Sequence, residues 1–263
     1  MKLITEINCL SMCEKMKRLS WNYLFIIYVC LTTISCDKEK DKSMASEIGC
    51  GAGSATVTDI DGNVYEILSI GSQCWTKQNL KSSRFNNGDV IATGLDSNTW
   101  ENTTLPAYKI YNDSAQYDSL FGKLYNYYTI VDSRGVCPVG WRPATINDWS
   151  ELIQYLDLSS SPDTNCQQCM VSSLVGLKNL SDVDNYTVVA NCPGNDSINF
   201  KAMAGGGVSH NSIYGNMGSA SCFWAAQGNL PDSARAMLEV FCNSIFKATT
   251  LKNVGLSVRC VKE

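Results

Sequence analysis

The first hydrophobic feature of the chain is an apolar segment near its N-terminus. Two basic residues precede the 17-residue stretch Leu19–Ser35, whose core Leu24–Leu31 is almost entirely apolar. A membrane-spanning helix needs about 20 apolar residues, whereas a short apolar core behind basic residues is typical of a secretory signal peptide. We therefore predict a signal peptide over residues 1–35, with translation starting at Met12 or Met16.

The apolar segment ends in Thr33-Ile34-Ser35-Cys36, and polar and small residues, the composition of a flexible tether, follow it. A small residue before a cysteine, directly after an apolar core, resembles the lipobox of bacterial lipoproteins, in which that cysteine carries the lipid. The resemblance implies a lipid on Cys36, a tether over residues 36–54, and a surface-exposed position at the bacterial outer membrane. The alternatives are an uncleaved single-span anchor, or a cleaved signal that leaves Cys36 an ordinary thiol.

The clearest β pattern surrounds Asp61-Gly62. β-Branched and aromatic residues flank this pair on both sides, from Val57 to Ile60 and from Asn63 to Ile70. Asp-Gly supplies the positive φ angles of a type I′ turn, so the sequence predicts a β-hairpin. Residues 81–120 are rich in Asn, Asp, Ser and Gly and predict loops with short strands. The aromatic-rich segment Tyr117–Val131 predicts core.

One amphipathic helix is predicted after residue 144. Thr145 is a suitable N-cap, and Asp148 three residues later completes a capping box. Apolar residues then follow at i, i+3, i+4 and i+7, at Trp149, Leu152, Ile153 and Leu156. This spacing places them on one buried stripe.

The remaining pattern indicates a single domain of the α+β class. Residues 159–198 are polar and bear cysteines, and we interpret them as an insertion. Short strand-like segments with glycine turns return from Asn199 onward. Strands broken by one or two helices, without βα alternation, favour an α+β fold over a doubly wound sheet. We predict that residues 55–262 fold as one domain.

Composition narrows the function classes. Hydrophobic residues make up 44% of the 263 residues, enough for a folded core. The formal net charge of −4 argues against a nucleic-acid partner, which needs a concentrated basic surface. His210 is the only histidine, so a multi-histidine zinc site is excluded and a catalytic triad would need this one ring. We assign no catalytic residue, no metal and no cofactor.

The cysteines fit an exported chain, because disulfides form in oxidising compartments. Nine follow Cys36, namely Cys50, Cys74, Cys137, Cys166, Cys169, Cys192, Cys222, Cys242 and Cys260. An odd number leaves at least one outside intramolecular pairs. Cys166 and Cys169 have the spacing of a zinc or redox motif, but no second such motif accompanies them. We interpret both as loop cysteines, with Cys192 as a candidate partner, and leave the pairing of Cys50 and Cys74 open.

Seven blocks occur in order along the chain: Asp59–Tyr65, Ile70–Trp75 with Asn79-Leu80, Gly122–Tyr128, Cys137–Arg142 with Thr145 and Asp148-Trp149, Phe200–Ala202 with Gly205-Gly206, Phe223-Trp224, and Gly255–Cys260. Together they resemble the Fibrobacter succinogenes major paralogous domain over residues 56–262. That family is similar to the C-type-lectin-like and sulfatase-modifying-factor group. The similarity implies a C-type-lectin-like fold with disulfides Cys137–Cys260 and Cys222–Cys242.

The resemblance also implies carbohydrate binding as a candidate function. The Glu-Pro-Asn or Gln-Pro-Asp and Trp-Asn-Asp signatures of calcium-dependent lectins are absent. Trp100, Trp224 and Tyr214, with Tyr108 and Tyr111, are candidate stacking residues; packing in the core or in a loop is the alternative for each. We expect a non-enzymatic recognition or adhesion module with a glycan or protein ligand. The alternative is an exported glycan-active or sulfatase-modifying-factor-like enzyme.

Overall fold

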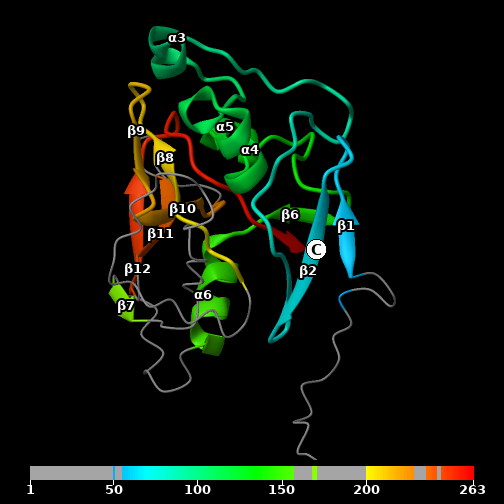
Figure 1. Ribbon diagram of the computed structural model, residues 1–263. Coiled ribbons are helices and arrows are strands. Elements are labelled where there is room, and N and C mark those ends of the chain that lie inside the picture. Colours follow the sequence, from blue (N-terminus) through cyan, green and yellow to red (C-terminus); the bar gives the residue numbers. More distant parts are fainter. Residues whose placement is uncertain (1–49, 51–54, 157–167, 171–199, 228–234, 242–243) are drawn as a thin grey trace, which may run out of the picture. The chain divides into compact units, whose positions relative to one another are not determined.

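The computed structural model describes residue 50 and residues 55–156, 168–170, 200–227, 235–241 and 244–263, all within one compact unit, Ser46–Glu263. The described part contains two β-sheets, a two-stranded ribbon and short helices (Figure 1). Most strand pairs are antiparallel. The α+β class predicted from the sequence is therefore confirmed.

A five-stranded antiparallel sheet combines the two ends of the domain. In spatial order it contains β1 (Thr56–Thr58), β2 (Val64–Ile70), β3 (Gln73–Thr76), β13 (Cys260–Lys262) and β6 (Trp141–Pro143). β13 pairs with both β3 and β6. The C-terminal strand thus lies between an N-terminal strand and the strand that leads into the main helix.

A six-stranded sheet lies on the other side of that helix (Figure 1). In spatial order it contains β7 (Gln168–Met170), β12 (Ser244–Thr250), β11 (Arg235–Phe241), β10 (Ala220–Trp224), β8 (Gly205–Val208) and β9 (Tyr214–Met217). Its neighbours pair antiparallel, except β8 and β10, which are parallel. β7 comes from the segment interpreted as an insertion. The rest of that segment, with Cys166 and Cys192, lies outside the described residues.

The predicted hairpin forms between β1 and β2, but its turn is not type I′. Asp59 N–H donates to Asn63 O at 3.0 Å, and Gly62 N–H donates to Asp59 O at 3.1 Å. Of the turn residues only Gly62 has a positive φ, 84°, whereas a type I′ turn needs two. The Asp59 carboxylate explains the difference, because it accepts the N–H groups of Asp61 and Asn63 and so stabilises a wider turn.

Two α-helices occur in or next to the segment 81–120, where loops and short strands were expected: α3 (Ser97–Asn102) and α4 (Ala115–Phe121). Asp96 caps α3 by accepting the backbone N–H of Thr99 at 2.7 Å. Trp100 on α3 is fully buried. A side-chain cap and one large buried residue therefore stabilise a helix that the polar composition conceals.

The aromatic segment Tyr117–Val131 supplies core side chains, as predicted. It continues from α4 into β5 (Leu124–Tyr125) and α5 (Tyr127–Ile130), and β5 pairs with β4 (Tyr108–Lys109). Its apolar and aromatic side chains with 5% exposure or less are Phe121, Leu124, Tyr125, Tyr127 and Ile130.

The predicted amphipathic helix is α6 (Ile146–Leu156), and its capping box is confirmed. The N–H and hydroxyl of Thr145 each donate to the Asp148 carboxylate at 2.6 Å, and Asp148 N–H donates to Thr145 Oγ1 at 3.2 Å. Leu152 and Ile153 are buried as expected. The side chain of Leu156 lies outside the described part.

Trp149 on α6 joins the two sheets. Its ring centroid lies 4.7 Å from that of Trp75 on β3 and 5.3 Å from that of Phe223 on β10. Phe200 completes the cluster at 5.9 Å from Trp149. Because Trp75 and Phe223 belong to different sheets, the two sheets and α6, which lies between them in Figure 1, share one apolar core.

Arg259 is buried beside this cluster, with 1% of its surface exposed. Its guanidinium lies 4.5 Å from the ring centroid of Phe200 and 5.5 Å from that of Phe223. It donates hydrogen bonds to Asn79 Oδ1 (2.7 Å) and to the backbone oxygens of Thr76 (2.9 Å), Phe200 (3.0 Å) and Lys201 (2.5 Å). One side chain thus fastens the end of β3 to the segment before β8.

Two disulfides close large loops in the described part. Cys137–Cys260, the pair that the resemblance implied, spans 123 residues, and Cys50–Cys74 spans 24. On the chain-entropy estimate such loops are worth about 5 and about 3.5 kcal/mol. The tether was expected to run from residue 36 to residue 54, but the Cys50–Cys74 disulfide already joins the chain to the domain at residue 50. Cys222 is buried on β10, whereas Cys242 lies outside the described residues, so that pair stays a prediction.

Replacing Arg259 by Met should destabilise the domain strongly. Met preserves an apolar stem but leaves four oxygens, three of them buried, without this donor, and each unsatisfied buried group costs about 1–3 kcal/mol. The urea midpoint of Arg259→Met should fall far below that of the wild type, with Arg259→Lys between the two. Arg84→Met, at a side chain that is 52% exposed, is the matched control and should shift the midpoint little. An Arg259→Met protein as stable as the wild type would contradict this role.

Candidate functional site

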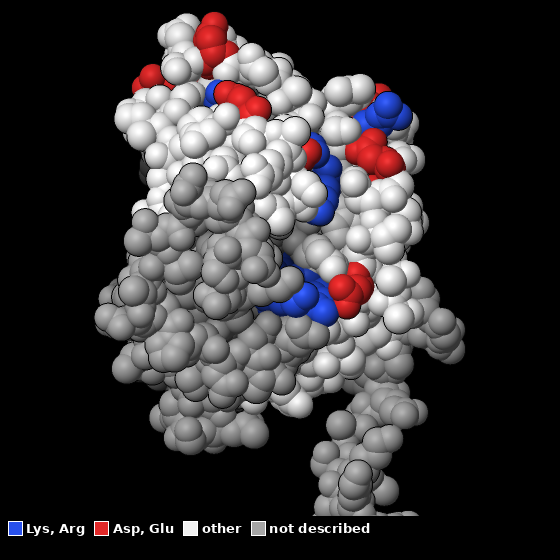
Figure 2. Space-filling model, in the orientation of Figure 1, with Lys and Arg blue, Asp and Glu red and all other residues white. Residues whose placement is uncertain are grey.

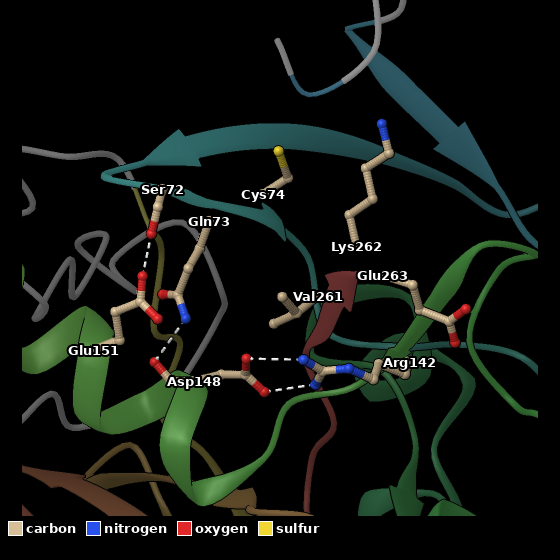
Figure 3. Close-up of a pocket in the computed structure, with 9 residues that line it drawn as sticks. All are labelled: Ser72, Gln73, Cys74, Arg142, Asp148, Glu151, Val261, Lys262 and Glu263. Atoms are coloured by element: carbon tan, nitrogen blue, oxygen red, sulfur yellow. Dashed lines mark hydrogen bonds and ion pairs between the residues drawn. The ribbon is translucent and has the colours of Figure 1, made fainter. Parts of the chain in front are cut away.

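A polar pocket of about 320 Å³ opens where α6 lies across the five-stranded sheet (Figure 3). Its walls come from the start of β3, from β6, from the first turns of α6 and from β13 with the residue that follows it. The lining residues are Ser72, Gln73, Cys74, Arg142, Asp148, Glu151, Val261, Lys262 and Glu263. Val261 is the one aliphatic side chain among them.

The two charged groups at the centre of the pocket, on Arg142 and Asp148, form an ion pair with each other. Arg142 donates two hydrogen bonds to the Asp148 carboxylate, at 2.6 and 3.0 Å. Gln73 Nε2–H donates to the backbone oxygen of Asp148 at 3.2 Å, and Ser72 Oγ–H donates to Glu151 (Figure 3). These bonds clamp α6 onto the sheet, which is a structural role. The groups left at the rim for a ligand belong to Glu151, Lys262 and Glu263.

The Asp148–Arg142 pair keeps its charges near neutral pH. Burial alone would raise the pKa of Asp148, but hydrogen bonds from Arg142 and Thr145 outweigh burial and lower it below 3.8. The hydrogen bond to Asp148 raises the pKa of Arg142 in turn. A carboxylate that stays ionised and a guanidinium that stays protonated are poorly suited to proton transfer at pH 7. Both groups instead hold the start of α6 on the sheet.

Two of the predicted stacking residues are core residues, which corrects that expectation. Trp100 is 0% exposed and Trp224 is 1% exposed, so neither ring offers a face to a ligand. Trp100 Nε1–H donates to Ser209 O at 3.1 Å, and Trp224 Nε1–H donates to Tyr125 O at 2.6 Å. Both indole N–H groups donate to backbone oxygens, which satisfies the polar end of each ring.

The tyrosines divide between core and surface. Tyr108 is buried, with the Lys123 ammonium 5.3 Å from its ring centroid. Tyr214 and Tyr111 are partly exposed, with ring centroids 5.0 Å apart, and Tyr117 lies 5.9 Å from Tyr111. The sequence placed Tyr117 in a core segment and did not connect it with Tyr214. No spacing rule links them, because the contact depends on how three separate elements fold together.

The remaining features concern His210, metal binding, membrane-spanning helices and surface charge in the described part of the chain. His210 lies in the turn between β8 and β9. Within the described ranges, no three His, Cys, Asp or Glu side chains are arranged to hold a metal ion. Nor is any described helix long and apolar enough to cross a bilayer. On the face drawn in Figure 2, the charged groups of described residues are scattered and of both signs.

These features define a small α+β domain held by disulfides. The chain belongs to the Fibrobacter succinogenes major domain family, whose model matches residues 68–262. The match begins at Leu68, so the block Asp59–Tyr65 precedes it. No curated protein and no solved structure matches the chain.

Asp148→Asn should destabilise the domain at neutral pH and weaken its dependence on acid. The lost cap and ion pair should cost about 2 kcal/mol at pH 7. Because the folded-state pKa of Asp148 is lowered, its contribution is present above about pH 4 and is lost as the pH falls through that lower pKa. Urea midpoints from pH 7 to pH 2.5 should therefore fall less steeply for Asp148→Asn than for the wild type. Parallel acid limbs would contradict this assignment.

Proposed function

We propose that the chain is an exported lipoprotein of the bacterial cell envelope, anchored by a lipid on Cys36 and exposed at the outer-membrane surface. The observation that carries this proposal is the pair of disulfides, because such bonds form in oxidising compartments. The apolar segment and the Ser35-Cys36 junction supply a matching export and lipidation signal.

The domain acts by binding, as a C-type-lectin-like recognition or adhesion module with no catalytic step. The fold proposal is supported by the Trp141–Pro143 strand, which leads into α6 and pairs with the Cys260 strand, and by the Cys137–Cys260 disulfide. The binding proposal is supported by the self-paired charges of the pocket and by partly exposed tyrosines elsewhere. The ligand is a glycan or a protein, because a net charge of −4 disfavours nucleic acid.

Lipidation is tested with an alkyne-tagged fatty acid supplied to cells that express the chain. The wild type should incorporate the tag, and Cys36→Ser should not, because the sulfur that carries the lipid is gone. Cys30→Ala, within the signal peptide, is the matched control and should still be tagged. Mass spectrometry should find Cys36 as an acylated first residue, with Cys50–Cys74 and Cys137–Cys260 oxidised. An unmodified amino terminus with reduced thiols would overturn the proposal.

Recognition is tested by the adhesion of intact cells to surfaces coated with polysaccharides or with proteins. Cells that display the wild-type chain should adhere better than Cys36→Ser cells to at least one coating, because only the anchored domain stays on the surface. Equal adhesion of both strains to every coating would contradict an adhesive role.

A further inference from the structure

Three tyrosines from three elements meet at the surface beside β9. Tyr111 begins η3 (Tyr111–Asp113), Tyr117 lies on α4, and Tyr214 begins β9. The rings of Tyr111 and Tyr117 meet edge to face at 83°, and those of Tyr111 and Tyr214 are tilted by 45°. We call these three residues the tyrosine patch. All three side chains are partly exposed.

The base of the tyrosine patch packs against the core. Tyr111 and Tyr214 pack against the small core cluster that contains Trp100 and Val208. Burial raises the pKa of Tyr111, and burial followed by the Asp113 carboxylate raises the pKa of Tyr214 to about 12. Because Tyr111 and Tyr214 are packed on one side against the core, their rings lose little conformational freedom when a ligand stacks on them, which favours affinity.

Polar side chains surround the tyrosine patch on an unusual backbone. Asn112 and Asp113 have successive positive φ values of 49° and 51°, and Asn216 on β9 has a φ of 63°. Residues other than glycine rarely adopt this left-handed backbone region, and among them Asn and Asp tolerate it best. The three side chains are exposed, and Tyr214 Oη–H donates to Asp113 Oδ1 at 3.4 Å. Amide and carboxylate groups therefore border the aromatic rings.

The ring geometry decides between two kinds of ligand. An aromatic cage for a cation needs rings held apart so that the cation fits between them. Here the centroids of neighbouring rings are only 5.0 and 5.9 Å apart, so the rings touch each other. The tyrosine patch therefore offers a stacking surface and no enclosed slot. The apolar face of a sugar ring fits such a surface, and its hydroxyls can reach the surrounding amides and carboxylate.

Charge narrows the sugar class. Asp113 lies within the hydrogen-bond reach of Tyr214, so a carboxylate or phosphate ligand would meet a like charge. A sugar without acidic groups meets no such repulsion and can donate hydroxyl hydrogen bonds to Asp113.

The position of the tyrosine patch suits an anchored protein. β1, where the chain joins the described domain, and β9 lie on opposite sides of the domain in Figure 1. A lipid attached before β1 would favour the β1 side facing the membrane. The side that bears β9 would then face outward, where a glycan could reach it.

We propose that Tyr111, Tyr117 and Tyr214, bordered by Asn112, Asp113 and Asn216, form a calcium-independent stacking site for neutral, non-acidic sugars. This inference rests on the proposed recognition function and names its ligand class. The site is separate from the pocket beside Arg142, with which it shares no residue.

The test uses the full chain, purified in detergent, in native gels that contain amylose, mixed-linkage β-glucan, xylan or galactomannan, with polygalacturonate as the acidic comparison. The wild type should be retarded by at least one neutral polysaccharide, with and without a calcium chelator. Tyr111→Ala and Tyr214→Ala should weaken that binding about tenfold, because each removes a stacking ring. Tyr155→Ala, at a 47% exposed tyrosine on α6, is the matched control and should bind as the wild type does.

Two conservative variants separate binding from folding. Tyr214→Phe keeps the ring and should retain most of the binding. Asp113→Asn keeps a residue that tolerates a positive φ, so the turn should persist. Asp113→Asn should bind neutral sugar within about threefold of the wild type and gain affinity for polygalacturonate, because the repelling charge is gone.

The outcomes distinguish this site from the proposed function. Equal binding of neutral sugar by the wild type and both alanine variants would overturn the site but leave glycan recognition standing. A wild type that binds none of the neutral polysaccharides, yet is lipidated and promotes adhesion to a protein coating, would overturn the sugar assignment alone. Stronger binding of polygalacturonate than of any neutral polysaccharide would also overturn it. If Cys36 carries no lipid, the proposed anchor is wrong, but the gel retardation of the purified chain still tests the sugar site.

Discussion

The buried guanidinium of Arg259 is the interaction on which the arrangement of the domain depends. A charged group with 1% exposure is tolerated only when its donors are satisfied, and here four oxygens surround it. Three of those oxygens belong to the backbone, of Thr76, Phe200 and Lys201, so the guanidinium fixes the course of the main chain. Phe200 and Phe223 cover its faces and bring the six-stranded sheet against the end of β3. Removing either the charge or its partners would leave unsatisfied groups inside the shared core.

This arrangement also brings together several of the short, separated blocks that carry the family resemblance. The blocks that contain Asn79, Phe200-Lys201, Phe223 and Arg259 are far apart in the sequence, yet all of them contact the same guanidinium. The adjacent residue Cys260 forms a disulfide with Cys137, from a fifth block. One packing centre therefore joins blocks that are widely separated in the sequence.

Local chemistry in the sequence predicted local structure well and long-range contacts poorly. The capping box of Thr145 and Asp148 was recognisable because both partners lie within one helical turn. The sequence predicted the wrong turn type at Gly62. The Asp59 carboxylate accepts the N–H of Asn63, four residues later, and so stabilises a different backbone path. The burial of Trp100 and Trp224, and the Cys50–Cys74 bond, depend on which distant segments meet; residue type alone could not decide between a binding surface and a core. The tyrosine patch was found only in part, through Tyr214 and Tyr111, for the same reason.

The Cys50–Cys74 bond also limits how far an anchored domain can move from its membrane. With a lipid on Cys36, only residues 37–49 separate the anchor from a cysteine that is bonded to β3. Thirteen residues span at most about 45 Å when fully extended, and about 20 Å as a flexible coil. A single domain of this length is itself about 45 Å across. A tether no longer than the domain is wide restricts its access to distant ligands, so a binding surface is most effective on the side away from β1. The tyrosine patch lies beside β9, on that side.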